Sequence, residues 1–499
     1  MMEKSPVALT LAHPECLFIG GEWVQPSSAA RFAVVSSSTE EVVATVAEAR
    51  HEDVERAVIA ARKAFDEGPW TRLTPAERGG YLRAMARELQ ERGEEFARVW
   101  SLESGILYKL ARARIGNWLG GAFNLYADLA ERFPFQESHR SAQGLQGLLV
   151  REPVGVVAAI IPWNGPAGLI AYKCAPALLA GCTVVVKPSP EAPCSAYLMA
   201  EACEKVGLPP GVFNVVTADR EVSEALVRHP GVDKVTFTGS TAAGRRIASI
   251  CGERIARCTL ELGGKSPAVV LDDYDVTRAA QAIGSGVGYL TGQVCHSLTR
   301  VIVSRERHDD MTDALSEVVR KMRVGDPFDP QAEVGPLATG RQRERVEGYI
   351  AQGRAEGARL ATGGGRPPHL ERGFYVEPTV FGNVDNRSTI GREEIFGPVL
   401  CVIPADDERQ AVALANDTVY GLNAAVFTHD REKFGAVARQ LRSGTVGHNG
   451  SRTDFSLAFG GFKQSGLGRE GGVEGLQAFI ETKTVVLDEP FAAEKGPSS

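Results

Sequence analysis

Apolar residues recur at helical spacing in the first third of the chain. Between residues 54 and 65 they stand at positions i, i+3, i+4 and i+7, which is the pattern of an amphipathic helix. Thr74, Pro75 and Glu77 then supply an N-cap, a proline at the first helical position and an acid at the third, which predicts a second helix ending near Arg92. We therefore expect the first third of the chain to be helical and to serve packing.

From Val154 the pattern changes to short apolar runs that alternate with helical segments. Strands are predicted at 154–161, 183–187, 212–216, 234–238 and 258–262, and helices up to residue 180, at 192–206, near 221–228 and from 242. Strands that are apolar throughout are buried on both faces, and helical crossovers between them make the strands parallel. The pattern predicts a Rossmann-like, doubly wound α/β sheet, which binds ligands at the carboxyl ends of its strands.

A second α/β region is predicted from about residue 275 to 447. Its strand candidates are 301–304, 400–404 and 424–427, and its helix candidates are 409–415 and 432–441. Residues 132–150 fit neither region and predict a projecting hairpin, whereas 479–487 alternates like one more strand. The tail after Pro490 is expected to be disordered.

Composition narrows the class of protein. The 499 residues are 43% hydrophobic and 23% charged, as in a soluble globular protein of about three domains. The net charge of −7 argues against a nucleic-acid-binding surface, and the longest nearly apolar run, 154–163, is too short to span a membrane. The nine cysteines are odd in number and lack zinc-ligand spacing, so we expect no metal site and a reducing, cytoplasmic location.

Two segments have the features expected of residues that line a ligand-binding crevice. Residues 237–244, FTGSTAAG, lie where a strand meets a helix: Gly239 permits a tight turn, and Ser240 caps a helix whose first N–H groups favour a phosphate. The glycine spacing is neither a dinucleotide fingerprint nor a P-loop, so a plain capped turn explains it equally well. Lys187 ends an apolar strand, where it either binds ribose hydroxyls or extends to solvent.

Three residues could carry reaction chemistry. Glu261 lies at the end of an apolar strand, where burying a carboxylate costs free energy unless it is paired or its pKa is raised so that it can act as a general base. For this residue taken alone, the interpretation as a paired glutamate is stronger. Cys295 has polar neighbours, as a reactive thiol needs, although an inert thiol is the default for one cysteine among nine; the adjacent His296 is expected to serve structure. Asn164 can donate to an oxyanion, but Asn–Gly is also a common turn.

The motifs become specific in combination. The chain carries, in order, PWNGP (162–166), KPSP (187–190), FTGSTAAG (237–244), LELGGKSP (260–267), GQVC (292–295), YVEPTV (375–380), EEIFGPV (393–399), ANDTVYGL (415–422) and GGFKQSGLGRE (460–470). In this order the chain resembles the aldehyde dehydrogenase superfamily, from FIGGEW at 18–23 to ETKTVV at 481–486. The resemblance implies an NAD(P)-dependent enzyme that oxidises an aldehyde to a carboxylic acid.

The resemblance also implies residue roles. Cys295 would be the nucleophile, Glu261 the base that activates water, and the Asn164 amide with the Cys295 N–H the oxyanion hole, while Lys173 and Glu470 would support a proton path. Lys187 and Glu394 would hold ribose hydroxyls, Ser240 the pyrophosphate, and Phe396 the nicotinamide ribose. The implied cofactor-binding set is Ile161, Pro162, Trp163, Lys187, Ser189, Gly239, Ser240, Leu262, Gly263, Glu394 and Phe396.

Departures from the family pattern concern cofactor and substrate. Ser189 and Pro190 stand where many NAD-specific relatives carry a glutamate; we expect NAD because Pro190 offers a 2′-phosphate no cation, but the sequence leaves NADP open. The implied substrate pocket is mostly apolar and predicts a hydrophobic or aromatic aldehyde, unless Arg452 binds the carboxylate of a semialdehyde. Its residues are Gly168, Tyr172, Leu290, Val294, His296, Arg452 and Phe459.

By resemblance, the chain divides into an NAD(P)-binding domain, a catalytic domain and a small β element for oligomerisation as a homodimer or homotetramer. The expected bounds are 10–131 with 151–262, then 263–465, and 132–150 with 479–490. Two other functions remain open: a coenzyme-A-acylating semialdehyde dehydrogenase, which would lack the water-activating glutamate, and a catalytically silent binding or structural protein on this fold. Because Cys295, Glu261 and Asn164 are all present, the hydrolytic enzyme is favoured.

Overall fold

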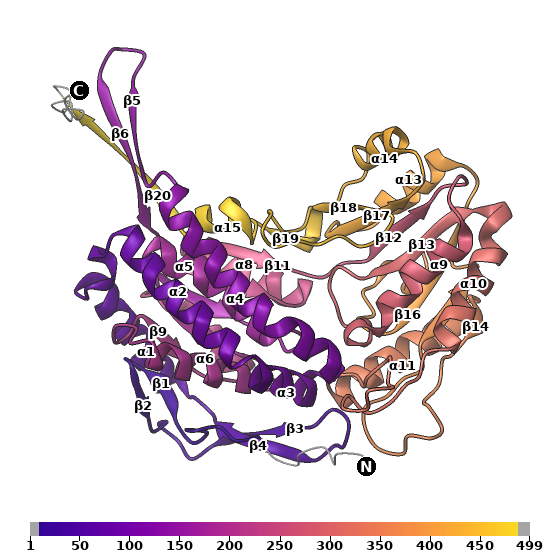
Figure 1. Ribbon diagram of the computed structural model, residues 1–499, viewed down its shortest axis with the longest axis horizontal. Helices are drawn as coiled ribbons and strands as arrows, with labels where there is room; N and C mark the ends of the chain where they lie inside the picture. Colours follow the sequence, from indigo (N-terminus) through magenta and orange to yellow (C-terminus); the bar gives the residue numbers. More distant parts are fainter. Residues whose placement is uncertain (1–8, 488–499) are drawn as a thin grey trace.

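The computed structural model describes residues 9–487. They form two lobes, each built on its own sheet, and a third, three-stranded sheet that projects from the first lobe as an arm (Figure 1). None of the helices in this part of the chain combines the length and the apolar character needed to cross a membrane.

The sheet of the first lobe has eight strands in the order β19-β11-β10-β7-β8-β9-β1-β2. Its five central strands are parallel: β7 (Val156–Ile160), β8 (Thr183–Lys187), β9 (Phe213–Val215), β10 (Lys234–Thr238) and β11 (Arg257–Glu261). Antiparallel strands complete both edges: β1 (Leu17–Ile19), β2 (Glu22–Val24) and β19 (Gly466–Leu467). The predicted doubly wound parallel sheet is confirmed, because the apolar runs are buried on both faces.

Helices cover both faces of this sheet. On one face lie α5 (Pro166–Ala180) and α6 (Cys194–Lys205), backed by α2 (Pro75–Glu91), α3 (Gly93–Ser104) and α4 (Tyr108–Arg132); on the other lie α1 (His51–Asp66), α7 (Arg220–Arg228) and α8 (Thr241–Glu253). The predicted start of α2 is present as a capping box, in which Glu77 N donates to Thr74 Oγ1 at 3.2 Å and Thr74 N donates to the Glu77 carboxylate at 2.6 Å.

The expectation that the whole first third is helical is wrong for residues 17–47. This segment forms β1 and β2 at the edge of the first sheet, and a separate hairpin of β3 (Arg31–Val35) and β4 (Val42–Ala47). A strand such as β1 is three residues long, too short for a periodic pattern, and it is stabilised by pairing with β9 almost two hundred residues away.

The second lobe contains a seven-stranded sheet in the order β14-β15-β16-β13-β12-β17-β18. Its strands are β12 (Ser266–Val270), β13 (Leu298–Ser304), β14 (Arg359–Thr362), β15 (Thr379–Gly382), β16 (Val399–Ala405), β17 (Asn423–Phe427) and β18 (Thr445–His448). Helices α9 (Val276–Ser285) and α10 (His308–Arg320) lie on one face, and α11 (Gly340–Ala355), α12 (Thr389–Arg392), α13 (Glu408–Asn416) and α14 (Arg431–Ala438) on the other. The predicted strands appear as β13, β16 and β17, whereas the other four were not predicted.

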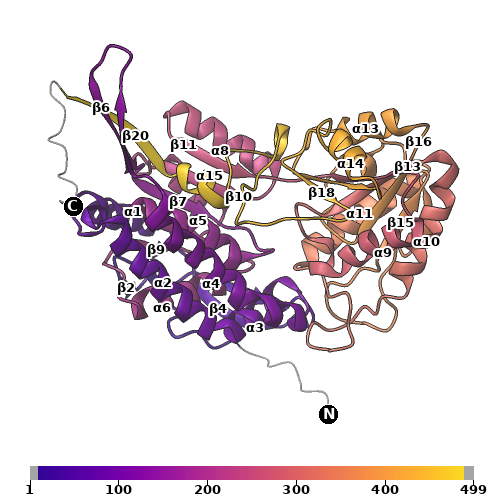
Figure 2. The same cartoon turned by 45° about the horizontal axis from the view of Figure 1, so that its top comes forward.

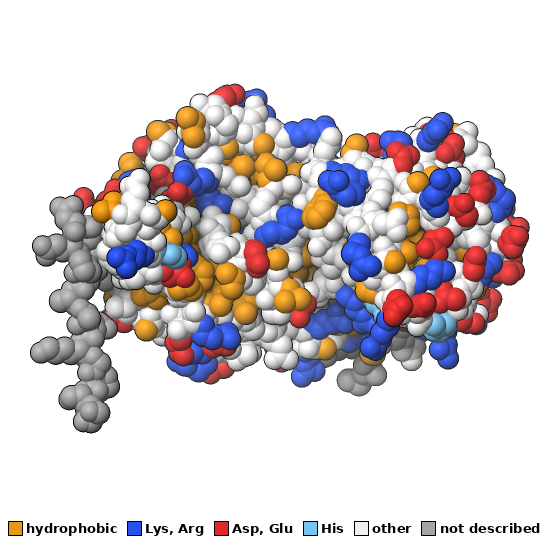
Figure 3. Space-filling view, turned by 90° about the horizontal axis from the view of Figure 1, so that it is seen from above, with side chains coloured by type: hydrophobic (Ala, Val, Ile, Leu, Met, Phe, Trp, Pro, Cys, Tyr) orange, Lys and Arg blue, Asp and Glu red, His pale blue; other side chains and the backbone are white. Residues whose placement is uncertain are grey.

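The predicted hairpin and C-terminal strand form the arm. β5 (Gln136–Arg140) and β6 (Gln146–Pro153) make the hairpin, and β20 (Ile480–Leu487) pairs along the whole of β6 (Figures 1 and 2). Figure 3 looks onto the face from which the arm projects: hydrophobic side chains gather mostly over the first lobe, whereas acidic and basic side chains are mixed over the second. On the arm itself, Leu145 and Val486 are among the exposed large apolar residues. The predicted tail after Pro490 lies outside the described residues.

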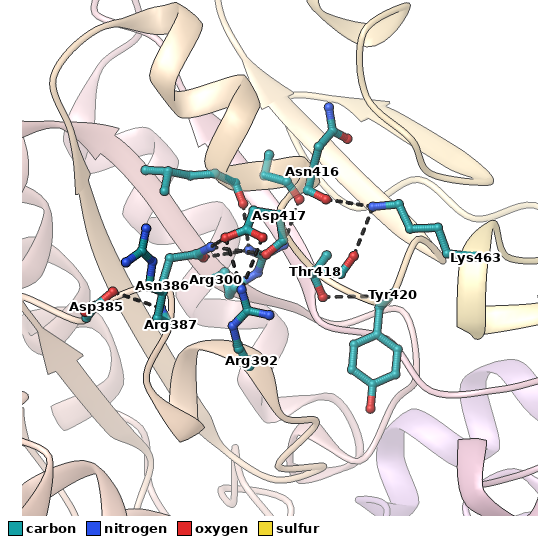
Figure 4. Close-up of polar contacts among 12 residues, drawn as sticks. Arg300, Asp385, Asn386, Arg387, Arg392, Asn416, Asp417, Thr418, Tyr420 and Lys463 are labelled. Carbon is teal, nitrogen blue, oxygen red and sulfur yellow. Dashed lines mark hydrogen bonds and ion pairs between the residues drawn. The ribbon is translucent and has the colours of Figure 1, made fainter.

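A buried arginine ties several loops of the second lobe together. Arg300, on β13, donates from Nε to the Lys265 carbonyl at 2.9 Å and from Nη1 to Asn386 Oδ1 at 2.8 Å. Its guanidinium also binds the carbonyls of Leu414 and Ala415 at the end of α13 (Figure 4). Because the Arg300 guanidinium is buried, these four hydrogen bonds replace those that it would otherwise form with water.

We expect Arg300→Met to lower the free energy of unfolding of the second lobe by at least about 3 kcal/mol, because each buried acceptor left unpaired costs about 1–3 kcal/mol. Arg305→Met is the matched control: Arg305 is exposed and, among the described residues, forms an ion pair only with exposed Asp406, so its loss should cost less than about 1 kcal/mol. Thermal unfolding followed by circular dichroism measures both changes. Equal midpoints for the two variants would contradict the role given to Arg300.

Candidate active site

A cavity of about 2210 Å³ opens between the two lobes. The carboxyl ends of four parallel strands reach it through Ile160, Lys187, Thr238 and Glu261, which is where a doubly wound sheet binds ligands. The second lobe supplies the facing wall, including residues 286–290, 292 and 294–299. Residues that are far apart in the sequence therefore meet around one space.

Cys295 is half-buried and lies in this second wall, after an unusual turn. Leu290 and Thr291 have φ angles of 49° and 55°, in the left-handed region that non-glycine residues rarely adopt. Gly292 follows with a φ of 71°, and a side chain there would bring its Cβ within 2.4 Å of the Gly397 carbonyl oxygen. Buried Gln293 holds the turn: its amide donates to the Leu290 carbonyl at 3.0 Å and accepts from the Ala338 N–H at 2.9 Å.

The Asn164 side chain reaches the segment that carries Cys295. Its Nδ2 donates to the carbonyl of Gln293 at 3.0 Å, and its own carbonyl accepts from Trp100 Nε1 at 2.8 Å. The amide thus lies between the end of β7 and the nucleophile candidate. This position suits a donor to an oxygen bound at Cys295.

Glu261, the last residue of β11, is buried and lines the cavity. Neither of its carboxylate oxygens has a hydrogen-bond partner within residues 9–487, so the interpretation as a paired structural glutamate is not supported. Gly460 lies directly against it, since a Cβ at that position would be 2.7 Å from Glu261 Oε1. Burial and the neighbouring Glu470 raise the pKa of Glu261 well above its usual range, against the opposing charges of Lys173 and Arg469.

Behind Glu261 lies a buried ion pair. Lys173, on α5, is fully buried and binds the carboxylate of Glu470, and it also donates to Thr236 Oγ1 at 3.4 Å. Glu470 lines the cavity, whereas Lys173 does not. The two predicted proton-path residues are therefore in contact, one behind the other.

The nucleophile candidate and its neighbour are both neutral in this site. Burial, together with the nearby Glu394 and Glu261, raises the pKa of the Cys295 thiol. Burial lowers the pKa of His296 to about 4, so its imidazole carries no charge near neutral pH. Thiolate formation at Cys295 consequently needs a base, and Glu261 is the buried, unpaired carboxylate at hand.

The other end of the cavity has the chemistry of a dinucleotide site. All eleven predicted cofactor residues line it. Ser240 caps α8, with its Oγ accepting from the Ala243 N–H at 3.3 Å, so that first-turn N–H groups are available to a pyrophosphate. Glu394 accepts from the Gly264 N–H at 3.0 Å, and Phe396 packs edge-on against Trp163 with ring centroids 5.4 Å apart.

Lys187 supports the same assignment. Its side chain is buried at the end of β8, and burial lowers its pKa to about 8 against the charges of Glu191 and Asp219. None of the ion pairs within residues 9–487 includes it. A buried ammonium that faces a cavity and lacks a partner fits a site for ribose hydroxyls.

The substrate end of the cavity differs from the prediction at two positions. Leu290, Val294, His296, Arg452 and Phe459 line the cavity, but Gly168 and Tyr172 do not. These two lie behind aromatic residues that do line it, because a Cβ at Gly168 would be 2.3 Å from the Trp118 ring and Tyr172 stacks on Phe455 at 4.5 Å.

Sequence reasoning missed Trp118 and Phe455 because each reaches the cavity only through packing of distant elements. Two further residues were not singled out from the sequence. Gln293 is part of the GQVC motif and holds the turn before Cys295, and Glu191 follows Pro190 and lines the cavity. No group of three or more His, Cys, Asp or Glu side chains within the described residues is arranged to hold a metal ion.

Comparison with known proteins agrees with this geometry. The model of the aldehyde dehydrogenase family matches residues 23–485. The chain belongs to the aldehyde dehydrogenase family. Geranial dehydrogenase of Castellaniella defragrans is 44% identical over 96% of this chain and all of its own length.

Two solved structures extend the comparison. An aldehyde dehydrogenase of Mycobacterium tuberculosis in complex with NAD+ has a TM-score of 0.94 and 44% identity, covering 97% of this chain and 100% of its own. A Pseudomonas syringae aldehyde dehydrogenase mutant with NAD+ and octanal has a TM-score of 0.93 and 40% identity, covering 96% and 98%. The protein is an NAD-dependent enzyme that oxidises an aldehyde to a carboxylic acid, and the acylating and silent alternatives are not favoured.

The raised pKa of Glu261 predicts how activity depends on pH. Because the carboxyl is protonated until the pH exceeds its pKa, kcat should rise with pH through a range well above the one in which a glutamate ordinarily ionises. Glu470→Gln removes a repelling charge and should move this limb to lower pH by roughly 1 unit, whereas Lys173→Met removes an attracting charge and should move it to higher pH.

Glu474→Gln, which changes an exposed carboxylate on α15 (Gly472–Gln477), is the control and should leave the profile unchanged. The measurement is kcat at saturating NAD and aldehyde across the pH range. If Glu470→Gln and Lys173→Met moved the limb in the same direction, the coupling of the buried pair to Glu261 would be refuted.

Proposed function

We propose that this enzyme oxidises hydrophobic or aromatic aldehydes and that Cys295, Glu261 and Asn164 carry the chemistry. The observation that supports these roles best is the unpaired, buried carboxylate of Glu261 on the same cavity as Cys295. A buried carboxylate without a partner is energetically unfavourable, and ionisable groups with strongly shifted pKa values cluster at active sites.

In the proposed mechanism, the Cys295 thiol gives its proton to Glu261, and the sulfur attacks the aldehyde carbon. The Asn164 amide and the Cys295 N–H donate to the resulting oxyanion, and each well-placed donor lowers the barrier by about 3–4 kcal/mol. Bound NAD supplies the acceptor for the hydride that leaves the substrate carbon.

A thioester then remains on Cys295. Glu261 first passes the proton from the thiol to the carboxylate of Glu470, which Lys173 contacts. Glu261 then takes a proton from water, whose oxygen attacks the thioester carbon; the carboxylic acid leaves, and Glu261 returns this proton to the Cys295 sulfur. Lys187, Glu394, Ser240 and Phe396 would hold the dinucleotide along the first lobe.

The substrate proposal rests on the aromatic lining of the cavity. Phe455 and Phe459 pack with centroids 4.5 Å apart, and Trp118 lies on the same cavity. Flat apolar walls of this kind favour an alkyl, alkenyl or aryl chain. Octanal in one related structure and geranial in the name of another relative belong to this class.

The proposal extends to organisation and assembly. Cofactor binding is assigned to residues 10–131 and 151–262, catalysis to 263–465, and oligomerisation to 132–150 and 479–490. Both outer strands of the arm, β5 and β20, leave an edge free within the described chain, and a free edge is a template for pairing with a second copy in a homodimer or homotetramer. All nine cysteines are free thiols, which suits a reducing cytoplasm.

Cys295→Ala should abolish turnover, by at least about 10³-fold, because the covalent intermediate cannot form. NAD binding, measured by isothermal titration calorimetry, should stay within about twofold of the parent, since binding does not use the sulfur. Cys258→Ala removes the other half-buried thiol and serves as the control. Turnover that survived in Cys295→Ala would reject the proposed nucleophile.

The enzyme should prefer octanal and benzaldehyde to succinic semialdehyde. Trp118→Ala should lower kcat/KM for octanal by roughly 10- to 100-fold, the equivalent of about 1.5–3 kcal/mol of lost apolar contact, and change acetaldehyde little. Arg452→Leu is the opposing control, because it should not affect octanal. A strong preference for succinic semialdehyde that Arg452→Leu abolished would overturn the substrate proposal.

A further inference from the structure

The last turn of α3 lies directly behind the segment that carries Asn164. Trp100 Nε1 donates to the Asn164 carbonyl at 2.8 Å, and Ser104 Oγ donates to the neighbouring Trp163 carbonyl at 2.6 Å. Trp100 and Ser104 are four residues apart in α3, so both face the same side of the helix. One helical turn therefore binds two successive carbonyls of the loop between β7 and α5.

These two bonds fix the backbone on both sides of the Asn164 Cα atom. The Trp163 carbonyl belongs to the peptide unit before this atom, and the Asn164 carbonyl belongs to the unit after it. Because peptide units are planar, holding both of them fixes the direction in which the Asn164 side chain leaves the backbone. Trp100 is 2% exposed and Ser104 is fully buried, and a buried carbonyl that loses its donor is energetically unfavourable, so both bonds hold the loop firmly.

The same end of α3 contacts the segment that holds the turn before the nucleophile. The helix is capped by Gly105 in the left-handed region, with a φ of 79°, and a Cβ there would be 2.5 Å from the Pro336 carbonyl oxygen. Next to Pro336, the Gly335 carbonyl accepts from Thr291 Oγ1 at 2.9 Å. The backbone at Gly335 and Pro336 therefore contacts the end of α3 on one side and the turn that precedes Cys295 on the other.

We propose that Trp100 and Ser104 act as positioning residues for Asn164. By holding both peptide units around its Cα atom, they set the place at which the Asn164 amide meets an oxygen bound at Cys295. The inference rests on the proposed function, in which the Asn164 amide and the Cys295 N–H bind the oxyanion. Placement matters because a donor stabilises the transition state only where it is preorganised, and a displacement of about 1 Å can slow a reaction about 10²-fold.

Trp100 has a second possible role, because it also lines the cavity and packs against the Trp118 ring with centroids 5.7 Å apart. A residue that served only as an apolar wall would affect long aldehydes and leave short ones unchanged, as expected for Trp118. A positioning residue acts on the carbonyl group, which every aldehyde has. The two roles therefore differ in whether octanal and acetaldehyde are affected equally.

Trp100→Phe tests the proposal, because it keeps an aromatic ring and removes the indole N–H. The measurement is the pre-steady-state rate of NADH formation at saturating NAD over a range of aldehyde concentrations. We expect the maximal rate to fall about 10- to 100-fold for octanal and acetaldehyde alike. The half-saturating octanal concentration and the Kd for NAD should stay within twofold of the parent, since neither depends on the oxyanion donor.

Asn164→Ala completes a double-mutant cycle. If Trp100 acts through Asn164, adding Trp100→Phe to Asn164→Ala should slow NADH formation by less than a further twofold. A merely structural role would instead give a loss that multiplies with that of Asn164→Ala. Ser104→Ala removes the other donor and is measured in the same way, so a test remains if Trp100→Phe does not fold.

Trp70→Phe is the matched control for Trp100→Phe, because Trp70 is fully buried and its Nε1 has no hydrogen-bond partner within residues 9–487. Ser195→Ala is the matched control for Ser104→Ala, because the buried Ser195 hydroxyl has no partner in the same part of the chain. Both controls should leave the rate of NADH formation within twofold of the parent.

A rate of NADH formation within twofold of the parent in either folded variant, Trp100→Phe or Ser104→Ala, overturns the inference. A loss that is confined to octanal, or one that multiplies with the loss in Asn164→Ala, overturns it as well. The proposed function fails differently, because in that case Asn164→Ala itself forms NADH at the rate of the parent.

Discussion

The site depends on one energetically unfavourable feature, a carboxylate that is buried at the end of β11 and has no hydrogen-bond partner in the described part of the chain. Glu261 is almost wholly buried where it lies, which disfavours its ionised form, and a second carboxylate nearby makes its ionisation harder still. The cost is tolerable only because the carboxyl can hold a proton. A buried carboxyl that can hold and release a proton on the same cavity as a protonated thiol has the properties expected of a catalytic base, which is the role we propose for Glu261.

Backbone geometry complements this electrostatic design. Two successive residues in the left-handed region precede Cys295, and such strain persists only where surrounding contacts impose it. Buried Gln293 supplies these contacts, and its carbonyl also receives the amide of Asn164 from the other lobe. The nucleophile candidate and the oxyanion donor are thus positioned by one hydrogen-bonded segment rather than independently.

Bonds between distant segments keep the second wall in register with the first. Arg300 joins the strand after the Cys295 turn to the Lys265 backbone, and hence to the glycine-rich segment that meets Glu394. At the dinucleotide end, the pair of Glu191 and Arg341 bridges the lobes directly.

The sequence alone determined the parallel sheet, the hairpin with its late strand, and the family, because apolar runs and ordered motifs are local properties of the chain. Its motifs also pointed to the eleven residues expected to bind the cofactor, all of which line the cavity, and to the three central catalytic candidates, although each of these residues taken singly had a structural explanation. Only the tertiary structure decided that Glu261 has no hydrogen-bond partner among residues 9–487, that Trp118 and Phe455 rather than Gly168 and Tyr172 face the cavity, and that Glu191 meets Arg341. Partnership and exposure depend on residues a hundred or more positions away, and no local pattern encodes them.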